Sequence, residues 1–410
     1  MSAELHVGPQ GFVVAAQQQE QRPMPPQMGR VERVYNRVAE AFQSLREFSF
    51  QKLIINHIFM PACMRPKSRL LEKENDFFQM YEKNIKIHEM SSEQRREYRK
   101  NKLKMKIKIP SENGRQLDGM RVMHPTQENQ PPSEQRWFVH MMCNSASYKD
   151  CLVEGYEMAN ATNCNLLMAD YGGVGESEGV KNRPMTSDDL ITDGLAMIQS
   201  LVDQGINPKH IMIYGICQGG AVAAQVAAKC PGVHTCIDRS FSEYSAVIRS
   251  GVSNKVSVYL GERLGDLAAR IIAFVVPYLI SWDLNNKAAS NQIRMNGGRQ
   301  IIIQHEMDEV ISGKYSLGHF WKQQLAYWTY VDKPNRDQNV PDLIVIPKED
   351  KLDYALTQGD LGKWDPTNRC YEKIGAHSED LNMFQLLQKD GTSKSAFNVV
   401  ADKIENILRG

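Results

Sequence analysis

The sequence lacks the cysteine spacing of a metal site or a disulfide framework, because none of its eight cysteines forms a C-x-x-C pair. Cysteines scattered in this way suit a reducing compartment. The N-terminus has no positively charged segment followed by a long apolar run, so no Sec-type signal peptide is predicted. We therefore expect a cytoplasmic protein, although secretion into another cell by a signal-less route stays open.

Long hydrophobic runs and an excess of charge of one sign are also absent. The most apolar run, residues 271–280, contains Pro277 and is too short to span a bilayer, so it predicts a buried helix or a lid and no integral membrane segment. The formal net charge is +1, which gives no general affinity for polyanions. The basic run at residues 95–108 alternates with apolar residues in its second half, which is typical of an exposed edge strand. No nucleic-acid partner is expected.

The N-terminal hundred residues are predicted to form a tail and a helical extension. Residues 1–29 are rich in Gln and Pro and bury too little apolar surface to fold, which predicts disorder. Residues 30–100 carry apolar side chains at helical spacing, and one helix is expected over 70–99. We expect this extension to be docked on the main domain. The alternative is an independent module that binds a protein partner.

Residues 101–410 are predicted to form one α/β domain. The segments LKMKIKIP, from Leu103, and LDGMRVMHP alternate on either side of Asn113 and Gly114, which predicts a β-hairpin. The apolar runs WFVHMM, from Trp137, and LLMA, from Leu166, then alternate with helical segments. Repeated alternation of this kind predicts a mostly parallel sheet with helices on both faces. Active groups in such sheets gather beyond the carboxyl ends of the strands.

The stretch IMIYGICQGG, residues 211–220, predicts a buried strand and a sharp turn that lead into the helix-forming stretch AVAAQVAAK. Gly215 and Gly219 are required there, because Cβ atoms would collide where strand and helix cross. Cys217 is expected in a strained conformation with its side chain outside the turn, as in the nucleophile elbow G-x-S-x-G with cysteine in place of serine. The helix N-terminus favours its thiolate. The alternative is a small buried cysteine without chemistry.

The order of hairpin, strand with a polar turn, DYGGVGESEG from Asp170, and elbow resembles the α/β-hydrolase superfamily. Members of that superfamily often carry D-x-R-G-x-G-x-S after the fourth strand. The likeness is strongest to acyl-thioesterases, depalmitoylases and serine-aminopeptidase-like enzymes, and it covers residues 103–410. It implies the α/β-hydrolase fold and a triad in the chain order nucleophile, acid, histidine.

The resemblance implies Asp308 as the triad acid, because the acid strand in the family ends in a string similar to D-x-V-I, here within IIIQHEMDEVI. Glu306 and Glu309 are its rivals. The resemblance likewise implies His377, in KIGAHSED, as the triad histidine, with a solvated loop residue as the alternative. None of four other histidines stands in the expected loop: His124, His140, His305 and His319.

By the same resemblance, the oxyanion hole consists of the backbone N–H of Gln218 and a second N–H from the turn after WFVHMM. Aligned on the family's H-G-N-A string, this turn reads Cys143-Asn144-Ser145-Ala146, so the second donor is Asn144 or Ser145. Cys143 and Asn144 replace the usual His-Gly. This departure leaves open how well the hole is formed.

Residues 245–290 are a possible cap insertion, mostly helical and rich in apolar side chains. In the α/β-hydrolase fold, a cap at this place would suit a fatty or aromatic acyl group. A packed core helix without a pocket is the alternative.

The expected function is a hydrolase or acyltransferase that cleaves an ester or thioester of a small-molecule or acylated substrate. The acyl group would be carried on Cys217, with His377 as base and Asp308 orienting the ring. One alternative is a catalytically idle scaffold that acts as a protein-binding or effector protein. A minor alternative is acyl polymerisation, since some polyhydroxyalkanoate synthases read very nearly GICQGG. The sequence shows no P-loop and no metal-ligand cluster, so no cofactor and no metal are expected.

Overall fold

The computed structural model describes residues 66–181, 185–247, 282–305, 308, 311, 315–331, 341–346, 364–365, 370–371, 381, 385–387 and 393–409. These residues belong to one compact unit, Leu53–Gly410. Several predictions lie outside the described residues: the tail 1–29, the extension as far as residue 65, residues 248–281 of the possible cap, Glu306, Glu309 and His377.

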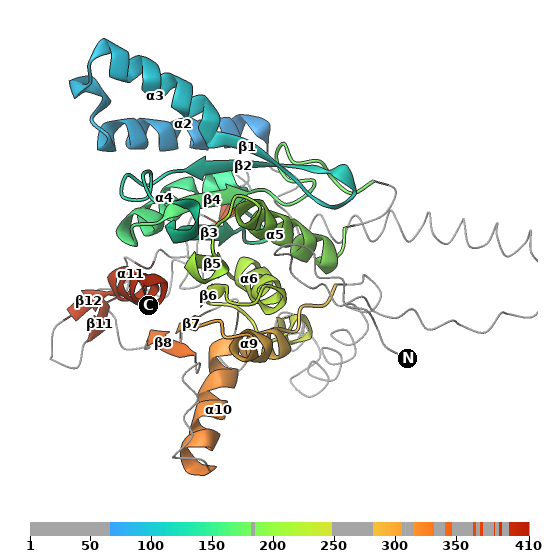
Figure 1. Ribbon diagram of the computed structural model, residues 1–410. Coiled ribbons are helices and arrows are strands. Elements are labelled where there is room, and N and C mark those ends of the chain that lie inside the picture. Colours follow the sequence, from blue (N-terminus) through green and yellow to red (C-terminus); the bar gives the residue numbers. More distant parts are fainter. Residues whose placement is uncertain are drawn as a thin grey trace, which may run out of the picture. The chain divides into compact units, whose positions relative to one another are not determined.

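An eight-stranded sheet forms the centre of this unit, in the strand order β1-β2-β4-β3-β5-β6-β7-β8 (Figure 1). Every neighbouring pair from β4 to β8 is parallel, whereas β1–β2 and β2–β4 are antiparallel. The strands are β1 Lys106–Pro110, β2 Gln116–Val122, β3 Trp137–Met141, β4 Asn165–Ala169, β5 Ile211–Ile216, β6 His234–Asp238, β7 Gln300–His305 and β8 Asp342–Ile346. The predicted mostly parallel sheet of the α/β-hydrolase fold is confirmed.

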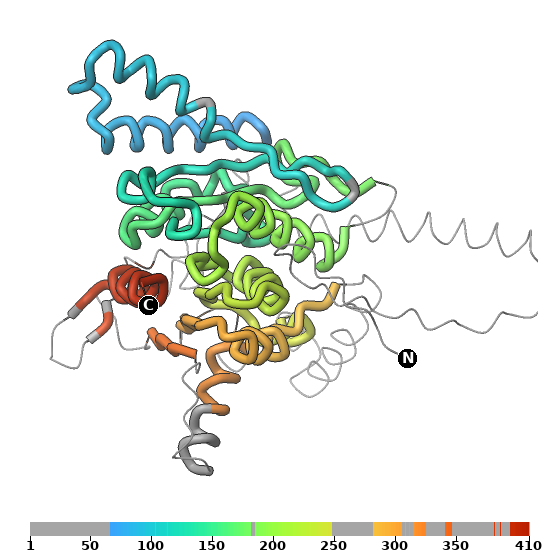
Figure 2. The backbone as a smooth tube through the Cα atoms, in the orientation of Figure 1, coloured from blue at the N-terminus to red at the C-terminus, as the bar shows by residue number. Residues whose placement is uncertain are grey.

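The colours of the sheet run from cyan at β1 to orange at β8 in Figure 2, because the strands follow chain order except that β3 and β4 are exchanged. Strands β3 and β4 contain the apolar runs of the sequence, and every residue of β3, β4 and β6 is buried. Two short antiparallel pairs lie outside this sheet: β9 Trp364–Asp365 with β10 Cys370–Tyr371, and β11 Gln385–Leu387 with β12 Ser393–Ser395.

The helices form two groups around the sheet, as Figure 1 shows. In one group α5 packs on α6 and α6 on α9, and in the other α11 packs against α4. Helix α10 contacts β7, β8 and α9. Their bounds are α4 Leu152–Ala161, α5 Ser187–Val202, α6 Gln218–Lys229, α9 Asn286–Met295, α10 Leu317–Val331 and α11 Ala396–Arg409.

The predicted hairpin is confirmed, with Ile109 opposite Leu117 and a turn at the 3-10 helix Glu112–Gly114. Strand β1 is an edge strand and exposes Lys106 and Lys108, as the alternation of the basic run indicated. The strand begins later than expected, because residues 103–105 still belong to a helix.

The single helix expected over residues 70–99 is wrong. Helix α2, Lys67–Asn84, ends before a turn in which Lys86 takes a positive φ of 52°, and helix α3, Ser92–Met105, follows. A capping box begins α3. The side-chain oxygen of Ser91 accepts from the N–H of Gln94, and the side-chain oxygen of Gln94 accepts from the N–H of Ser91. The string SSEQ in the sequence carried this signal.

A buried ion pair holds α2 on the sheet. Glu74, buried on α2, pairs with Lys106 of β1 and with Lys149, whose Nζ lies 3.0 Å from Glu74 Oε2. Burial opposes ionisation, but the two lysines lower the pKa of Glu74. Lys149 is itself buried in the 3-10 helix Tyr148–Asp150. The first helix described is thus docked on the α/β domain through charge as well as through Phe77.

We predict that Glu74→Ala destabilises the protein by about 3 kcal/mol, because Lys149 loses its nearest carboxylate while it stays buried. Unfolding in urea measures this loss as a lower midpoint. Glu72→Ala, at an exposed position of the same helix, is the matched control and should change the stability by less than about 0.5 kcal/mol. Equal midpoints for the two variants would contradict the prediction.

Candidate active site

The predicted strand, turn and helix around Cys217 are present. Cys217 follows β5 directly and caps α6, with φ 54° and ψ −117°. Such a conformation costs a non-glycine residue about 1–3 kcal/mol and persists where the surroundings enforce it. A Cβ on Gly215 would collide with the backbone of Gly219, and a Cβ on Gly219 would collide with the carbonyl oxygen of Met141. The glycines are therefore required for the reason that the sequence suggested.

Hydrogen bonds from the next strand hold the backbone of Cys217. Its N–H donates to the carbonyl oxygen of Asp238 at 3.0 Å, and the Ser240 hydroxyl donates to its carbonyl oxygen at 2.6 Å. The Cys217 side chain is only half-buried, whereas Cys236 on β6 is fully buried. Among the described cysteines, Cys217 is thus the one that combines a positive φ with a side chain accessible from outside.

The turn after β3 carries the proposed second oxyanion donor. The N–H of Ala146 reaches the carbonyl oxygen of Cys143 at 3.5 Å, so Asn144 and Ser145 occupy the two central positions of a turn. This turn lies next to the elbow, because Gly219 of α6 approaches the backbone at the end of β3. Gln218 is the first residue of α6. The structure thus brings Gln218, Asn144 and Ser145 to the same edge of the sheet as Cys217.

A carboxylate missing from the sequence prediction fixes that turn. Asp170, the first residue of DYGGVGESEG, is fully buried, and its two oxygens accept from the Ser147 hydroxyl at 2.8 Å and from the Tyr148 N–H at 2.7 Å. Burial raises the pKa of Asp170 from its ordinary 3.8 to about 7, against the opposing effect of these two hydrogen bonds. The sequence marked Asp170 as part of a motif, but nothing local indicated its partners.

A second buried carboxylate anchors the loop between β4 and α5. Asp193 accepts from the Gly172 N–H at 2.8 Å and forms an ion pair with Arg115 at 3.0 Å. A Cβ on Gly172 would meet the Arg115 guanidinium at 2.5 Å. The loop that follows the fourth strand is therefore packed against the hairpin turn.

Asp238, at the end of β6, is the described carboxylate whose backbone contacts the elbow directly. Its two oxygens accept from the Arg239 guanidinium, each at 2.8 Å, and one also accepts from the Tyr214 hydroxyl at 3.0 Å. Both members of this ion pair are fully buried. Although burial opposes the charge of Arg239, Asp238 raises its pKa. This pair supports the backbone beneath Cys217 and has a structural role.

The predicted acid, Asp308, follows β7, which is separated from β5 by β6 alone in the sheet. These three strands are parallel, so Asp308 and Cys217 stand beyond the same edge. Asp308 is buried, and its Oδ1 accepts from the N–H of Ile311 at 2.7 Å. The structure therefore brings Asp308 and Cys217 to one edge, and His377 lies outside the described residues.

Three other histidines noted in the sequence lie on described strands or helices. His140 is buried in the middle of β3, where burial lowers its pKa to about 3 and keeps it neutral. His305 is the last residue of β7, and His319 lies on α10 beside Gln323. Within the described segments, no group of three His, Cys, Asp or Glu side chains is arranged to hold a metal ion. In those segments, too, no helix has the length and apolarity needed to cross a membrane.

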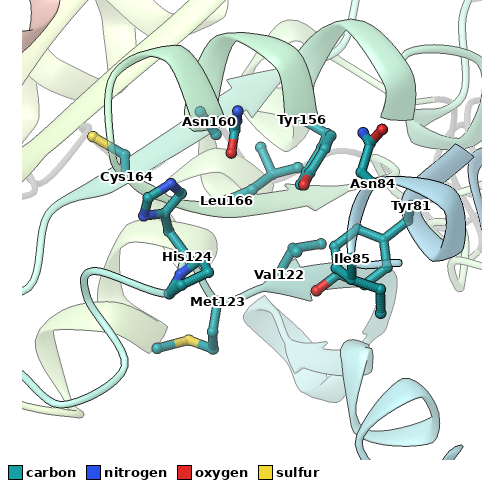
Figure 3. A pocket seen from close by; sticks show the side chains of 12 residues that line it. Tyr81, Asn84, Ile85, Val122, Met123, His124, Tyr156, Asn160, Cys164 and Leu166 are labelled. Atoms are coloured by element: carbon teal, nitrogen blue, oxygen red, sulfur yellow. The ribbon is translucent and has the colours of Figure 1, made fainter. Parts of the chain in front are cut away.

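A cavity of about 600 Å³ lies between α2, α4 and the end of β2 (Figure 3). Tyr81, Tyr156 and His124 point into it, and Leu166 marks the amino end of β4 in its wall. Asp170 follows the opposite end of that strand, roughly 13 Å away at 3.3 Å per residue. The cavity is thus not the pocket of the elbow cysteine.

No family model and no curated protein matches the sequence. Among solved structures, the esterase Pf2001 from Pyrococcus furiosus matches with 18% identity and a TM-score of 0.40, over 59% of this chain and 81% of that one. Est1E from Butyrivibrio proteoclasticus matches with 12% identity and a TM-score of 0.40, over 74% and 97%. An alpha-beta hydrolase from Vibrio vulnificus matches with 16% identity and a TM-score of 0.39, over 60% and 73%. Because these likenesses are remote, we infer the chemistry from this chain's own residues.

We predict that wild type loses stability relative to Asp170→Asn as the pH rises from about 4 to about 7. An acid whose pKa is raised on folding contributes stability that is present below its unfolded pKa and is lost as the pH rises through the folded pKa. Urea unfolding at several pH values should show that the unfolding free energy of wild type minus that of Asp170→Asn falls by on the order of 1 kcal/mol per pH unit. This difference should be flat above pH about 7.

The exposed Asp188→Asn is the control for loss of one surface carboxylate. A difference between wild type and Asp170→Asn that stays constant across this pH range would contradict the raised pKa.

Proposed function

We propose that this protein is a cysteine-dependent hydrolase or acyltransferase that cleaves an ester or thioester through an acyl-Cys217 intermediate. The observation that carries the proposal is the conformation of Cys217, a half-buried thiol held at φ 54° at the junction of β5 and α6. Strain of this kind is retained where it serves a function. The side chain stands at the N-terminus of a 12-residue helix, which favours negative charge near its sulfur.

In the proposed mechanism, His377 removes the proton of Cys217 or holds an imidazolium beside the thiolate, and Asp308 orients the ring. The carboxylate of Asp308 is suited to this work because its loop is fixed by the bond from Ile311 and stands beyond the same strands as Cys217. After attack, the thioester of Cys217 passes its acyl group to water or to another acceptor.

The tetrahedral oxyanion is proposed to accept hydrogen bonds from the N–H of Gln218 and from that of Asn144 or Ser145. Two observations support this assignment: Gln218 opens α6 directly after the nucleophile, and the turn after β3 is fixed by Asp170. Since the hydrogen bonds to Asp170 leave the turn little freedom, its N–H groups would need no reorganisation during the reaction.

Aromatic side chains beside the sulfur favour an apolar acyl group. Tyr244 is buried close to Cys217, and burial together with that neighbouring sulfur raises the Tyr244 pKa well above its usual value. Its ring packs on Phe241 and Trp282, with centroid distances of 5.1 and 6.4 Å. A fatty or aromatic acyl chain would find a wall of this kind favourable. The substrate class proposed is therefore an apolar acyl ester or thioester, of a small molecule or an acylated protein.

The six described cysteines without a disulfide, Cys217 among them, are consistent with the reducing, cytoplasmic compartment that we propose.

We predict that Cys217→Ala lowers kcat/KM for p-nitrophenyl esters and acyl-CoA thioesters by about 10⁴-fold or more, because the acyl group loses its point of attachment. The acyl chain length should be varied, and longer chains should be favoured. Cys230→Ala, at the other end of α6, is the matched control and should retain activity. Turnover that survives Cys217→Ala would remove the nucleophile. No turnover by wild type, together with slow alkylation of Cys217 by iodoacetamide, would favour the idle scaffold.

We predict a larger loss of kcat for His377→Ala than for Asp308→Asn, because the acid acts only through the imidazole. The losses of kcat caused by the two substitutions should not be additive in the double variant. Glu306→Gln and Glu309→Gln, which change the two acids nearest to Asp308 in the sequence, are the controls and should keep near-normal rates. The assignment of the acid fails if one of these two glutamine variants, and not Asp308→Asn, slows the enzyme.

A further inference from the structure

A second cysteine, Cys143, follows the neighbouring strand β3 at the same register at which Cys217 follows β5. Strands β3 and β5 are parallel and adjacent, with Met141 opposite Gly215. Cys143 and Cys217 each follow their strand two residues beyond this pair. Neighbouring strands lie about 4.8 Å apart, and the Cα atoms of a disulfide are usually about 4.4–6.8 Å apart. Because both residues lie equally far beyond the last paired residues, the register sets Cys143 and Cys217 side by side at one edge of the sheet.

The packing of α6 keeps the two turns together. A Cβ added to Gly219 would collide with the carbonyl oxygen of Met141 and would lie 2.9 Å from the carbonyl oxygen of Met142, the residue before Cys143. The elbow therefore cannot move away from the end of β3 without loss of this contact. Because Asp170 fixes the far end of the turn after β3, both cysteines are held on anchored backbone.

The thiol of Cys143 interacts electrostatically with that of Cys217. Burial, and next the proximity of Cys217, raise the pKa of Cys143, so its thiol stays protonated at neutral pH. Cys143 in turn contributes to the raised pKa of Cys151, which burial dominates. Cys143 is thus an electrostatic neighbour of both other sulfurs, and all three cysteines are free and half-buried.

We propose that Cys143 is the resolving thiol for Cys217 and that oxidation by a hydroperoxide joins the two in a reversible disulfide. The Cys217 thiolate attacks hydrogen peroxide, the O–O bond breaks, and one oxygen remains on sulfur as a sulfenic acid; the other leaves as hydroxide, which takes up the proton that the Cys217 thiol had lost and becomes water. The sulfur of Cys143 then attacks that of Cys217, the S–O bond breaks, and the hydroxide released takes the Cys143 proton. Two thiols lose two electrons and two protons, and hydrogen peroxide is reduced to two waters.

The disulfide would block acyl transfer and would protect Cys217 from irreversible oxidation to the sulfinic acid. The loss of acyl transfer rests on the proposed function, but the formation of the disulfide does not. Cys151, the N-cap of α4, has Cys143 and not Cys217 among the neighbours that shift its pKa, and it therefore provides a matched control.

The test treats the full chain with hydrogen peroxide and follows the intact mass and the non-reduced peptides by mass spectrometry. Wild type and Cys151→Ser should lose two hydrogen atoms and yield a peptide pair linked through Cys143 and Cys217. Cys143→Ser and Cys143→Ala should give no such pair and should accumulate the sulfinic acid of Cys217. Circular dichroism establishes that each variant is folded.

Activity provides a second readout, with each protein compared with its own untreated rate. After peroxide and then dithiothreitol, wild type and Cys151→Ser should recover nearly all of their activity, whereas the Cys143 variants should recover almost none. A Cys143–Cys151 pair, or sulfinic acid at Cys217 in wild type without any crosslink, would overturn the proposal. If the protein proves to have no acyl-transfer activity, the crosslink itself still decides the question.

Discussion

The close approach of α6 to the ends of β3 and β5 is the constraint on which the catalytic edge depends. Gly215 and Gly219 leave no room for a Cβ, so strand and helix meet backbone to backbone. A residue at the apex of so tight a turn is driven to a positive φ, and Cys217 is that residue. The same contact brings the turn after β3 next to the nucleophile. Strain at one residue and the assembly of a donor turn thus have one physical origin.

Three buried aspartates fix the backbone of the turns at this edge of the sheet. Asp170 fixes the turn after β3, Asp193 fixes the loop after β4, and Asp238 supports the elbow from β6. Each has partners that come from another element, so the ends of four neighbouring strands are tied to one another. Asp238 also shows why proximity does not identify a triad acid: its oxygens are committed to Arg239 and Tyr214. The role of a carboxylate here follows from its partners rather than from its distance to the sulfur.

The sequence predicted those parts whose cause is local. Gly215 and Gly219 stand four residues apart, so their crowding could be read from spacing, and the hairpin at Gly114 was equally visible. The partners of Asp170 could not be predicted, because Ser147 lies 23 residues away and the strand exchange between β3 and β4 brings them together. The burial of Glu74 was hidden for a similar reason. A charged side chain on a polar helix gives no sign that Lys149 will be buried opposite it.

A cysteine at this elbow can be oxidised, whereas a serine cannot, and Cys143 in the neighbouring turn could react with the oxidised sulfur. A serine hydroxyl is not oxidised by peroxide, whereas a thiolate is, and its reactivity rises with the same exposure that lets substrate approach. Burial and the proximity of Cys217 both raise the pKa of Cys143 and keep it neutral, so it would not compete as a nucleophile for the proposed acyl group. Once Cys217 carries an oxygen, that sulfur becomes an electrophile, and a thiol in register on the next strand needs no diffusion to reach it. In the mechanism that we propose, one geometry serves both states of the sulfur, because the anchored turn offers its N–H groups to the oxyanion and Cys143 to an oxidised Cys217.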